Sequence, residues 1–387
     1  ASRGLGDVYK RQIICDENTY VAAGEEVEEV ISKGNFIKLK SENLHANEVA
    51  VQKVYECLVA ESDVLIALGA GTIHDITRYV AYNKDIPFIS VPTAASVDGF
   101  TSTVADMTWR GYKKTFTAVS PIYVVADTDI FKEAPYRLTA SGVSDLIGKY
   151  IALVDWKISS IVIGEYICNR ICNMEIDAIN KVCQCVDELV LGNTEAYEQL
   201  MYALIISGLA MQIIGNSRPA SGAEHHMANL WEMEVINEHL NAYHGERVSA
   251  ALILVMEEYE KIKKAIENER CRVKKYSGLE MDMLKEVFRG REMYNSIIKE
   301  NTPDPLLNVN KVILQNRLEN IAEILEKLPT LDFVKNTLMR AKAVTTFEEI
   351  GLPQGIKEKS LRISPYTTNR LTLMSCLLYT SPSPRDA

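Results

Sequence analysis

Three short apolar runs in the first third of the chain constrain its fold more than any other feature. They are VLIAL at residues 64–68, PFISV at 87–91 and IYVVA at 122–126. Each is rich in β-branched residues and bounded by turn formers, which is typical of parallel strands buried on both faces. The segment IHDITRYVAYNKD between the first two runs places its apolar residues at helical spacing. The pattern predicts a βαβ unit and therefore an α/β sheet, with IICDENTY as an earlier strand.

The pattern changes after Pro135, where we expect no further strands. Four segments there carry apolar residues every three to four positions: DLIGKYIALVDWKISSIVIGEYICNRICNM, EAYEQLMYALIISGLAMQIIG, RVSAALILVMEEYEKIKKAI and LENIAEILEKL. This spacing predicts a helical bundle. The chain is thus predicted to contain an α/β domain at residues 13–136, followed by an all-α helical domain at 137–375.

The two ends do not fit this pattern. ASRGLGDVYKRQ runs abruptly into a strand-like segment, and SCLLYTSPSPRDA is a Ser/Pro run without apolar period. Both resemble adapter-derived ends of translated reads. We therefore expect residues 1–12 to be a non-native leader and residues 376–387 a non-native tail.

Charge and composition restrict the partners. The formal net charge of −10 argues against nucleic acid or an anionic membrane surface, which an acidic protein repels. No apolar run approaches the roughly 18 residues that span a bilayer, so we expect no stable membrane insertion. The eight cysteines lack the spacing of a zinc module and indicate buried thiols in a reducing cytoplasm.

A glycine-rich turn follows the first predicted strand of the βαβ unit. In ALGAGTIHDIT, Gly69, Gly71 and Thr72 stand where a strand turns into a helix, as in loops that bind phosphate at a helix N-terminus. His74 replaces the third glycine of the full motif, so a tight turn closed by a capping box of Thr72 and Asp75 is an equal alternative. Asp16, at the end of IIC, could bind an adenosine ribose or merely end its strand.

Two adjacent histidines in SGAEHHMANLWEM suggest a metal site, because a catalytic divalent ion commonly takes three protein ligands. Neighbours on a helix point about 100° apart, so only one can face the site. The polar stripe is His225, Asn229 and Glu232, whereas His226 shares a stripe with Leu230 and Met233. We expect His225 to be the ligand and His226 a buried neighbour. His244 before Gly245 and Asp145 at the start of the helical half are the other candidates; the alternative is that none binds metal.

Several blocks together resemble one family. They are GAGTIHDITRY, SVPTAASVDGFTS, KKTF, VVADTDIFKEAPYRLTASGVSDLIGKY, SGAEHHMANLWEM and YHGERV, within a similarity that runs from about Ile13 to about Leu373. They are similar to the glycerol-1-phosphate dehydrogenases, and in particular to their bacterial branch within the iron-containing alcohol dehydrogenase and glycerol dehydrogenase superfamily. The resemblance implies the dehydroquinate synthase-like architecture, a Rossmann-like domain followed by a helical one.

The resemblance also implies an activity. Such enzymes reduce dihydroxyacetone phosphate to sn-glycerol 1-phosphate with NADH or NADPH, which feeds glycerophospholipid and ether-lipid synthesis. They use one divalent metal, zinc in archaeal relatives and nickel in some bacterial ones; iron accepts the same donor set. We expect a small-molecule substrate and a homo-oligomer, most simply a dimer.

The resemblance carries site residues by motif position. The dinucleotide would contact Asp16, Gly71, Thr72, Ile73, His74, Asp75, Thr93, Ala94, Ala95, Ser96 and Ser102. Asp98 would contact the substrate and act in catalysis. Asp145, His225 and His244 would hold the metal, with Asp145 also catalytic and near the substrate. Arg218 and Lys149 are candidates for the substrate phosphate, although either also fits a solvated surface charge.

Two departures from the family pattern matter. Asn229 stands where relatives carry a substrate-contacting His, and an amide cannot carry a proton. Relatives also have a strand and a helix before the segment that matches Ile13, so we expect an N-terminally truncated sheet. Three alternatives stay open: a glycerol dehydrogenase with an unphosphorylated substrate, a lyase like 3-dehydroquinate synthase, and an inactive binding protein.

Overall fold

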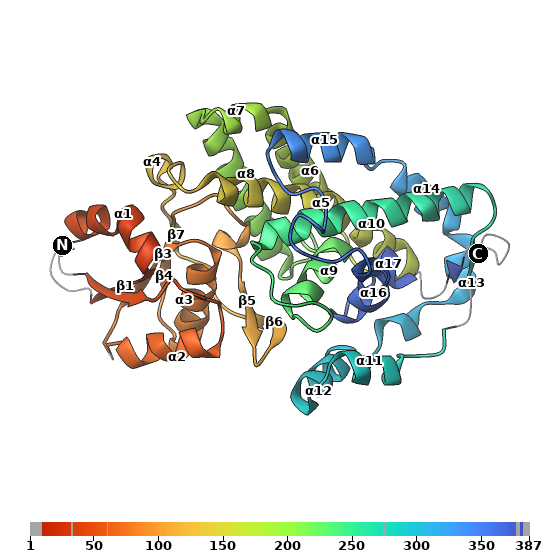
Figure 1. Ribbon diagram of the computed structural model, residues 1–387, viewed down its shortest axis with the longest axis horizontal. Helices are drawn as coiled ribbons and strands as arrows, with labels where there is room; N and C mark the ends of the chain where they lie inside the picture. Colours follow the sequence, from red (N-terminus) through yellow and green to blue (C-terminus); the bar gives the residue numbers. More distant parts are fainter. Residues whose placement is uncertain (1–9, 32–33, 60, 274–275, 377–379, 382–387) are drawn as a thin grey trace. The chain divides into compact units, whose positions relative to one another are not determined.

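A parallel sheet forms the centre of the first part of the chain (Figure 1). The computed structural model describes residues 10–31, 34–59, 61–273, 276–376 and 380–381. These divide into two units: one runs to Val143 and includes Gln184–Asn216, and the other comprises Ser144–Cys183 and the residues from Ser217 onward.

The described residues of the first unit form a five-stranded sheet in the order β2-β1-β3-β4-β7. The strands are β1 (Arg11–Asp16), β2 (Asn35–Leu39), β3 (Val64–Gly69), β4 (Phe88–Pro92) and β7 (Tyr123–Val124). All four pairings are parallel, so the carboxyl ends of the strands meet at one edge of the sheet. The parallel sheet and the strands at 64–68 and 87–91 are confirmed, and the run at 122–126 forms only a two-residue strand. The predicted strand IICDENTY was half wrong: it is a strand only to Asp16, which caps α1 (Glu17–Val30).

Strand β1 begins inside the segment that the sequence assigned to a leader. Arg11 pairs with Val64, and Gln12 pairs with both Asn35 and Leu65. The side chain of Gln12 is 2% exposed, and its amide oxygen accepts a hydrogen bond from the backbone N–H of Val59 at 2.8 Å. Residues 11 and 12, which the sequence analysis placed in the leader, thus form part of the sheet. The rest of the predicted leader, apart from Lys10, lies outside the described residues.

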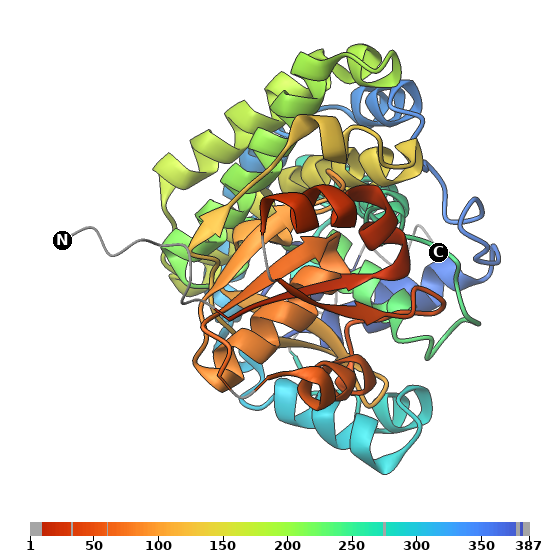
Figure 2. The same cartoon turned by 90° about the vertical axis from the view of Figure 1, so that its left-hand side faces the viewer.

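Helices cover both faces of the sheet because successive strand side chains point to opposite sides. Ile14, Leu65 and Ala67 belong to the cluster beneath α2 (Glu48–Cys57) and α3 (Gly71–Lys84). Ile13, Ile66 and Leu68 belong to the cluster beneath α1 (Glu17–Val30). Figure 2 shows α1 on one side of the strands and α2 and α3 on the other.

An antiparallel hairpin, β5 (Val104–Trp109) and β6 (Tyr112–Thr117), follows the 3₁₀ turn η1 (Gly99–Thr101). The turn residues Arg110 and Gly111 both have positive φ, 53° and 79°, as the tight two-residue hairpin turn requires. The sequence analysis did not predict this hairpin.

The helix α8 (Thr194–Ile214) belongs to the sheet unit, not to the helical one. Gly208 allows it to approach η1 closely, because a Cβ there would lie 2.7 Å from the carbonyl oxygen of Asp98. The preceding helix α7 (Val186–Val190) and the start of α5 (Tyr136–Ile163) join the same unit. The two units thus differ from the predicted domains 13–136 and 137–375, because apolar period identifies a helix but not its packing partner.

The second unit is helical, as predicted. Its long helix α10 (His244–Glu267) packs against α9 (Ala223–Glu232), α14 (Leu318–Leu325) and α15 (Leu331–Arg340). The other helices are α6 (Asn169–Gln184), α11 (Met281–Val287), α12 (Arg291–Glu300), α13 (Lys311–Asn316), α16 (Ile356–Ile363) and α17 (Leu373–Cys376), with the 3₁₀ turns η2 (Pro305–Asn308) and η3 (Ser364–Tyr366). In the first unit, α4 (Thr128–Phe131) completes the set.

One pair of strands contradicts the expectation that strands end at Pro135. It is the two-residue pair β8 (Arg272–Val273) and β9 (Thr380–Ser381). Strand β9 and Cys376 in α17 lie in the predicted tail, whose other residues are outside the described part. By length and composition α8 could cross a membrane, but half of its most apolar window is buried inside the protein.

Candidate metal centre and dinucleotide loop

Asp145, His225 and His244 come together in the second unit, as the sequence predicted. One ligand atom from each lies within 4.8 Å of the others. Asp145 is in the middle of α5, His225 is in the first turn of α9, and His244 opens α10. The imidazole rings of the two histidines are 5.2 Å apart between centroids, and Nε2 of His225 lies 3.4 Å from Oδ1 of Asp145.

Lys149 lies one turn after Asp145 on α5 and is fully buried. Its Nζ donates to Oδ1 of Asp145 at 2.5 Å. Burial acts to raise the pKa of Asp145, but the Lys149 ammonium, with His225 and His244, outweighs it and holds that pKa well below its usual range. Asp145 is therefore an anionic ligand, and Lys149 is not the solvated surface charge that one interpretation of the sequence allowed.

Glu224 orients His225 from the side opposite Asp145. Nδ1 of His225 donates to Oε1 of Glu224 at 2.7 Å, so Nε2, which faces Asp145, is the nitrogen that becomes available as a ligand when the ring is neutral. A carboxylate behind a ligating imidazole fixes its tautomer and raises its basicity. Burial and Lys149 lower the pKa of His225, but the bonds to Asp145 and Glu224 prevail and raise it to about 9. The sequence analysis missed Glu224, although its place beside His225 was a visible signal.

Asp155 lies behind Glu224 and is also fully buried. Its Oδ2 accepts the backbone N–H of Ala223 at 2.9 Å, and its Oδ1 accepts the Tyr259 hydroxyl at 2.6 Å. Asp155 therefore satisfies a donor in the first turn of α9, where N–H groups lack helical partners. Burial raises the pKa of Asp155 to about 7, with Glu224 contributing and the accepted hydrogen bonds opposing.

The helix-face prediction for the two adjacent histidines agrees with the structure. His225 faces the triad, whereas His226 is 1% exposed and neither of its ring nitrogens has a hydrogen-bond partner. Burial, with Arg370 and Arg218 adding to it, lowers the pKa of His226 well below its usual value. Asn229 follows one turn after His225 and is half-buried, while Glu232 pairs with Arg247 at 3.2 Å.

The donor set fits a divalent cation. Two imidazoles and one carboxylate converge, which zinc, nickel and iron all accept. The fully buried side chains around them include the carboxyl groups of Asp145 and Glu224 against the single ammonium of Lys149. The two carboxylates favour a positive charge at His225, as the raised pKa of its ring indicates, and a divalent ion would supply that charge in place of the proton.

In the first unit, β3 passes directly into α3 through Gly69, Ala70 and Gly71. The capping-box alternative was wrong: the N-cap is Ala70, which makes no side-chain cap bond. The N–H groups of this first turn therefore lack the side-chain acceptor that the box would supply, which is the arrangement that favours an anion.

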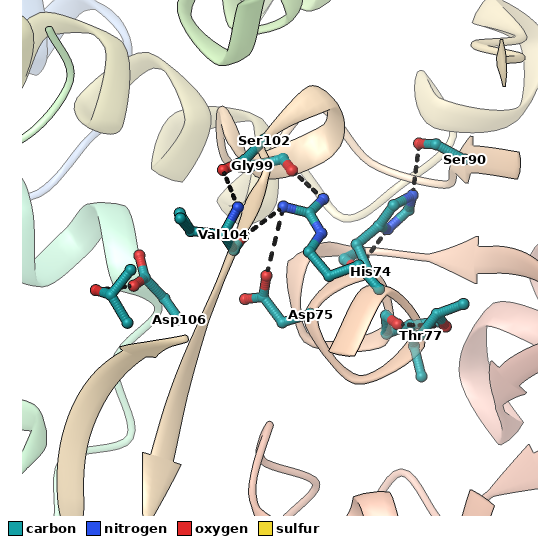
Figure 3. Close-up of polar contacts among 12 residues, drawn as sticks. His74, Asp75, Thr77, Ser90, Gly99, Ser102, Val104 and Asp106 are labelled. Atoms are coloured by element: carbon teal, nitrogen blue, oxygen red, sulfur yellow. Dashed lines mark hydrogen bonds and ion pairs between the residues drawn. The ribbon is translucent and has the colours of Figure 1, made fainter. Parts of the chain in front are cut away.

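His74 and Ile73 point into the protein, not into the loop. Both are 1% exposed. Nδ1 of His74 donates to the carbonyl of Ala70 at 3.0 Å, so its Nε2 accepts from the Ser90 hydroxyl at 2.7 Å (Figure 3). Burial lowers the pKa of His74 to about 3, which keeps the ring neutral. Any contact of these two residues with a dinucleotide would use their backbone, as would that of Gly71.

Asp16 is the N-cap of α1, and its carboxylate accepts from the N–H groups of Asn18 and Thr19 at 2.8 and 3.0 Å. Thr72 in the first turn of α3 and Asp75 just after that turn are both half-buried. Partial burial raises the pKa of Asp75 to about 7, with Arg78 opposing and Asp106 adding.

The loop after β4 is buried against α5. Thr93, Ala94, Ala95 and Ser96 are each at most 5% exposed. The backbone N–H of Thr93 donates a hydrogen bond of 3.0 Å to the carbonyl oxygen of Gly69, and this bond connects the loop to the glycine turn. Gly142 of α5 packs so closely that a Cβ there would lie 2.0 Å from the carbonyl oxygen of Ala95. The sequence analysis did not identify Gly142.

The same loop continues to Asp98 and Ser102. Oδ2 of Asp98 accepts the Ser207 hydroxyl of α8 at 2.9 Å, and Oγ of Ser102 accepts the N–H of Val104 at 3.1 Å. Arg218 is 3% exposed and bonds Glu165 through Nε at 2.8 Å and Nη2 at 2.5 Å. It is therefore an internal ion pair, and not a solvated charge.

Comparison with known proteins agrees with this geometry. A sequence model of the family described as iron-containing alcohol dehydrogenase matches residues 5–135. A glycerol-1-phosphate dehydrogenase [NAD(P)+] from Geobacillus thermodenitrificans is 31% identical over 379 residues, 95% of this chain and 87% of that protein. The chain belongs to the glycerol-1-phosphate dehydrogenase family. The resemblance inferred from the sequence blocks is thereby confirmed.

Other relatives extend the comparison. The enzyme of the same description from Bacillus velezensis is 40% identical over 262 residues, covering 65% of this chain and 66% of that protein. Among solved structures, an archaeal halo-thermophilic alcohol dehydrogenase from a Red Sea brine pool superposes with a TM-score of 0.63 at 16% identity, covering 96% of this chain and 90% of that one. The second likeness shows the fold alone, and it confirms the predicted dehydroquinate synthase-like architecture.

Proposed function

We propose that this protein reduces dihydroxyacetone phosphate to sn-glycerol 1-phosphate with NADH or NADPH. The observation that carries the proposal is the 31% identity to a glycerol-1-phosphate dehydrogenase over 95% of the chain. The converging triad of Asp145, His225 and His244 supports it independently. The product would be a glycerol backbone for phospholipid or ether-lipid synthesis.

The triad would hold one divalent metal, zinc or nickel, with iron as a further fit. When bound, such an ion polarises a ketone oxygen and stabilises the negative charge that develops on it. Asp145 supplies the anionic ligand, and Lys149 holds its Oδ1 in place. Glu224 keeps His225 in the tautomer whose Nε2 is available.

The reaction adds a hydride from the reduced nicotinamide to C2 of the ketone and a proton to its oxygen. We assign dinucleotide binding to the main chain of Gly71–Asp75, the loop Thr93–Ser96, and Ser102. The N-terminal end of α3 would receive the pyrophosphate, because its first N–H groups lack a side-chain cap. The Asp16 carboxylate already accepts hydrogen bonds from the first N–H groups of α1. It would bind the ribose only by accepting a ribose hydroxyl in addition to these bonds.

Asp98 would contact the substrate and orient or relay the proton. Asn229, one turn after His225, would offer the substrate a hydrogen bond but no proton. The carboxylate of Asp98 would thus handle the proton, whereas the amide of Asn229 would only hydrogen-bond the substrate. Asp145 would lie near the substrate as well as bind the metal.

The test is an assay of NADH and NADPH oxidation on protein stripped with chelator and resupplied with single metals. Turnover with dihydroxyacetone phosphate at far higher kcat/KM than with dihydroxyacetone is the expected result. The reverse preference would make the protein a glycerol dehydrogenase. Binding of NAD without net oxidation of NADH on either ketone would favour a lyase, and failure to bind any metal would favour an inactive binding protein.

We further propose that the enzyme works in the cytoplasm as a homodimer. Sedimentation equilibrium of the purified chain would give about twice the 43.4 kDa of one chain. A mass of one chain at assay concentration would refute the dimer without affecting the reaction.

A further inference from the structure

The loop that carries Asp98, here called the Asp98 loop (residues 98–104), is fixed by hydrogen bonds from two helices of the first unit. Arg78 of α3 bonds its main chain, and Ser207 of α8 bonds the Asp98 side chain. Neither residue was identified from the sequence.

Arg78 is fully buried, which is unusual for a charged side chain. Its Nη1 donates to the carbonyl of Val104 at 2.8 Å, and its Nη2 donates to the carbonyl of Gly99 (Figure 3). Asp75, one turn earlier on α3, lies 3.8 Å from Nη1. The planar guanidinium presents its donors in fixed directions, so one side chain sets the spacing of two carbonyls at the two ends of the loop.

Helix α8 holds the opposite side of the Asp98 loop. The Ser207 hydroxyl, which is fully buried, donates to Oδ2 of Asp98 at 2.9 Å. The Thr101 hydroxyl donates to the carbonyl of Ile205 at 3.2 Å, and Gly208 leaves room for the loop to lie against the helix. A carboxylate bonded at one oxygen cannot rotate freely, so Ser207 sets the direction of the Asp98 carboxylate.

We propose that Arg78 and Ser207 are positioning residues that together set the Asp98 carboxylate for the reaction. The proposal rests on the proposed function, in which Asp98 contacts the substrate. Arg78 acts through the backbone of the loop, and Ser207 acts on the side chain itself. A misplacement of about 1 Å at a reacting group can cost on the order of a hundredfold in rate, so both contacts have catalytic consequences.

The test is a set of double-mutant cycles against Asp98→Asn, measured on the metal-loaded enzyme with dihydroxyacetone phosphate and NADH. Asp98→Asn should lower kcat/KM on the order of a hundredfold. Ser207→Ala and Arg78→Lys should each lower kcat by about tenfold or more and leave the KM for NADH unchanged. In the Asp98→Asn background the same two substitutions should cause little further loss, because the group that they position is gone.

Thr77→Val is the matched control on α3. The Thr77 hydroxyl is as buried as Arg78 but bonds only the carbonyl of Ile73 within its own helix, at 2.7 Å. Its kcat should equal that of the unmodified protein, and the thermal midpoint of Ser207→Ala should stay within a few degrees of it.

Two outcomes would overturn the proposal. One is an equal loss from Ser207→Ala with and without Asp98→Asn, and the other is a full kcat in Ser207→Ala. Because Ser207→Ala removes a single oxygen, it decides the matter even if Arg78→Lys fails to fold. Absence of turnover with dihydroxyacetone phosphate in the unmodified protein would instead overturn the proposed function.

Discussion

The glycine turn of the first unit and the metal triad of the second are built in different ways. The turn uses backbone groups of consecutive residues, Gly69 to Gly71, with the side chains of Ile73 and His74 directed inward. The triad uses side chains from three helices, with Asp145 and His244 separated by 99 positions in the chain. One site is determined by local chain geometry and the other by how helices pack.

This difference determines which kind of substitution would impair each site. The turn is sensitive to the volume of nearby side chains, because an added methyl group can displace the loop. The triad is sensitive to charge and hydrogen bonding, because each of its buried polar groups needs a partner. Removing one group therefore leaves its partner buried without compensation. Substitutions in the two units should therefore separate dinucleotide binding from metal binding.

The largest effect is expected from the ligand itself. His225→Ala removes one of the three converging ligand atoms and should abolish metal retention, with a loss of kcat of roughly a thousandfold or more. Metal content by mass spectrometry and NADH oxidation would measure both. The dissociation constant for NADH should stay unchanged, since the turn lies in the other unit.

His226→Ala is the matched control, because the neighbouring ring has no hydrogen-bond partner at either nitrogen. It should retain metal and lose less than about tenfold in kcat, together with some stability from the cavity that it leaves. Equal losses of metal in the two variants would contradict the assignment of helix faces.

Local pattern predicted the first site and part of the second. The strands, α3 and the glycine turn follow from short apolar runs and helical period, which depend on residues close in sequence. His225 was separated from His226 by the same local argument, and Lys149 could have been paired with Asp145 by its spacing of four. Asp145 and His244 were candidates from their positions in the chain, and the family resemblance joined them to His225 as one ligand set, because no local pattern reports contact between distant helices.

Other features had no local signal. The assignment of α8 to the sheet unit depends on Gly208, whose importance lies in the approach of Asp98 and Thr101. Arg78 carried no signal of its own in the sequence, and its burial is explained by its bonds to the Asp98 loop and the start of the hairpin that follows it. Such residues are determined by tertiary contacts and need the structure.

The second prediction concerns Glu224, which should affect metal binding without being a ligand. Glu224→Gln keeps the size of the side chain but removes the charge that faces Nδ1 of His225. Metal affinity should fall by about 10- to 100-fold, as measured by competition with a chromophoric chelator. Glu257→Gln, which removes a carboxylate of α10 that bonds Lys335 and Lys357, is the control and should not alter affinity. An unchanged affinity in Glu224→Gln would mean that the hydrogen bond to His225 does not support the ligand.

The third prediction tests the role of space in the first unit. Gly142→Ala would place a methyl group 2.0 Å from the carbonyl oxygen of Ala95, so the loop Thr93–Ser96 must move. The dissociation constant for NADH should rise by about tenfold and stability should fall by about 1–3 kcal/mol, whereas metal affinity should not change. Gly355→Ala is the control, since nothing lies within 4 Å of its added methyl group. Weakened metal binding in Gly142→Ala would show that the two sites are not separable.

The smallest effect is a change in how stability depends on pH, and it arises behind the triad. Burial raises the pKa of Asp155 from the ordinary 3.8 to about 7. Between these values the unfolded chain has released the proton and the folded chain still holds it, so this group lowers stability as pH rises through that window. A displacement of this size corresponds to roughly 4 kcal/mol at most.

The Asn side chain of Asp155→Asn cannot titrate, so this variant should lack the fall in stability with rising pH that Asp155 causes. The substitution costs stability at pH 4.5, because both oxygens of the Asp155 carboxyl group accept hydrogen bonds from Ala223, Tyr259 and Leu373, and the amide nitrogen of Asn cannot accept one. The difference in the free energy of unfolding between the unmodified protein and Asp155→Asn should then become smaller as pH rises to 7. Urea unfolding of the two metal-free chains at several pH values would measure it. A gap that is constant with pH would show that Asp155 has the same pKa in both states, and a gap that widens would show that its carboxylate is stabilised by its three donors. Either result would show that the pKa of Asp155 is not raised in the folded protein.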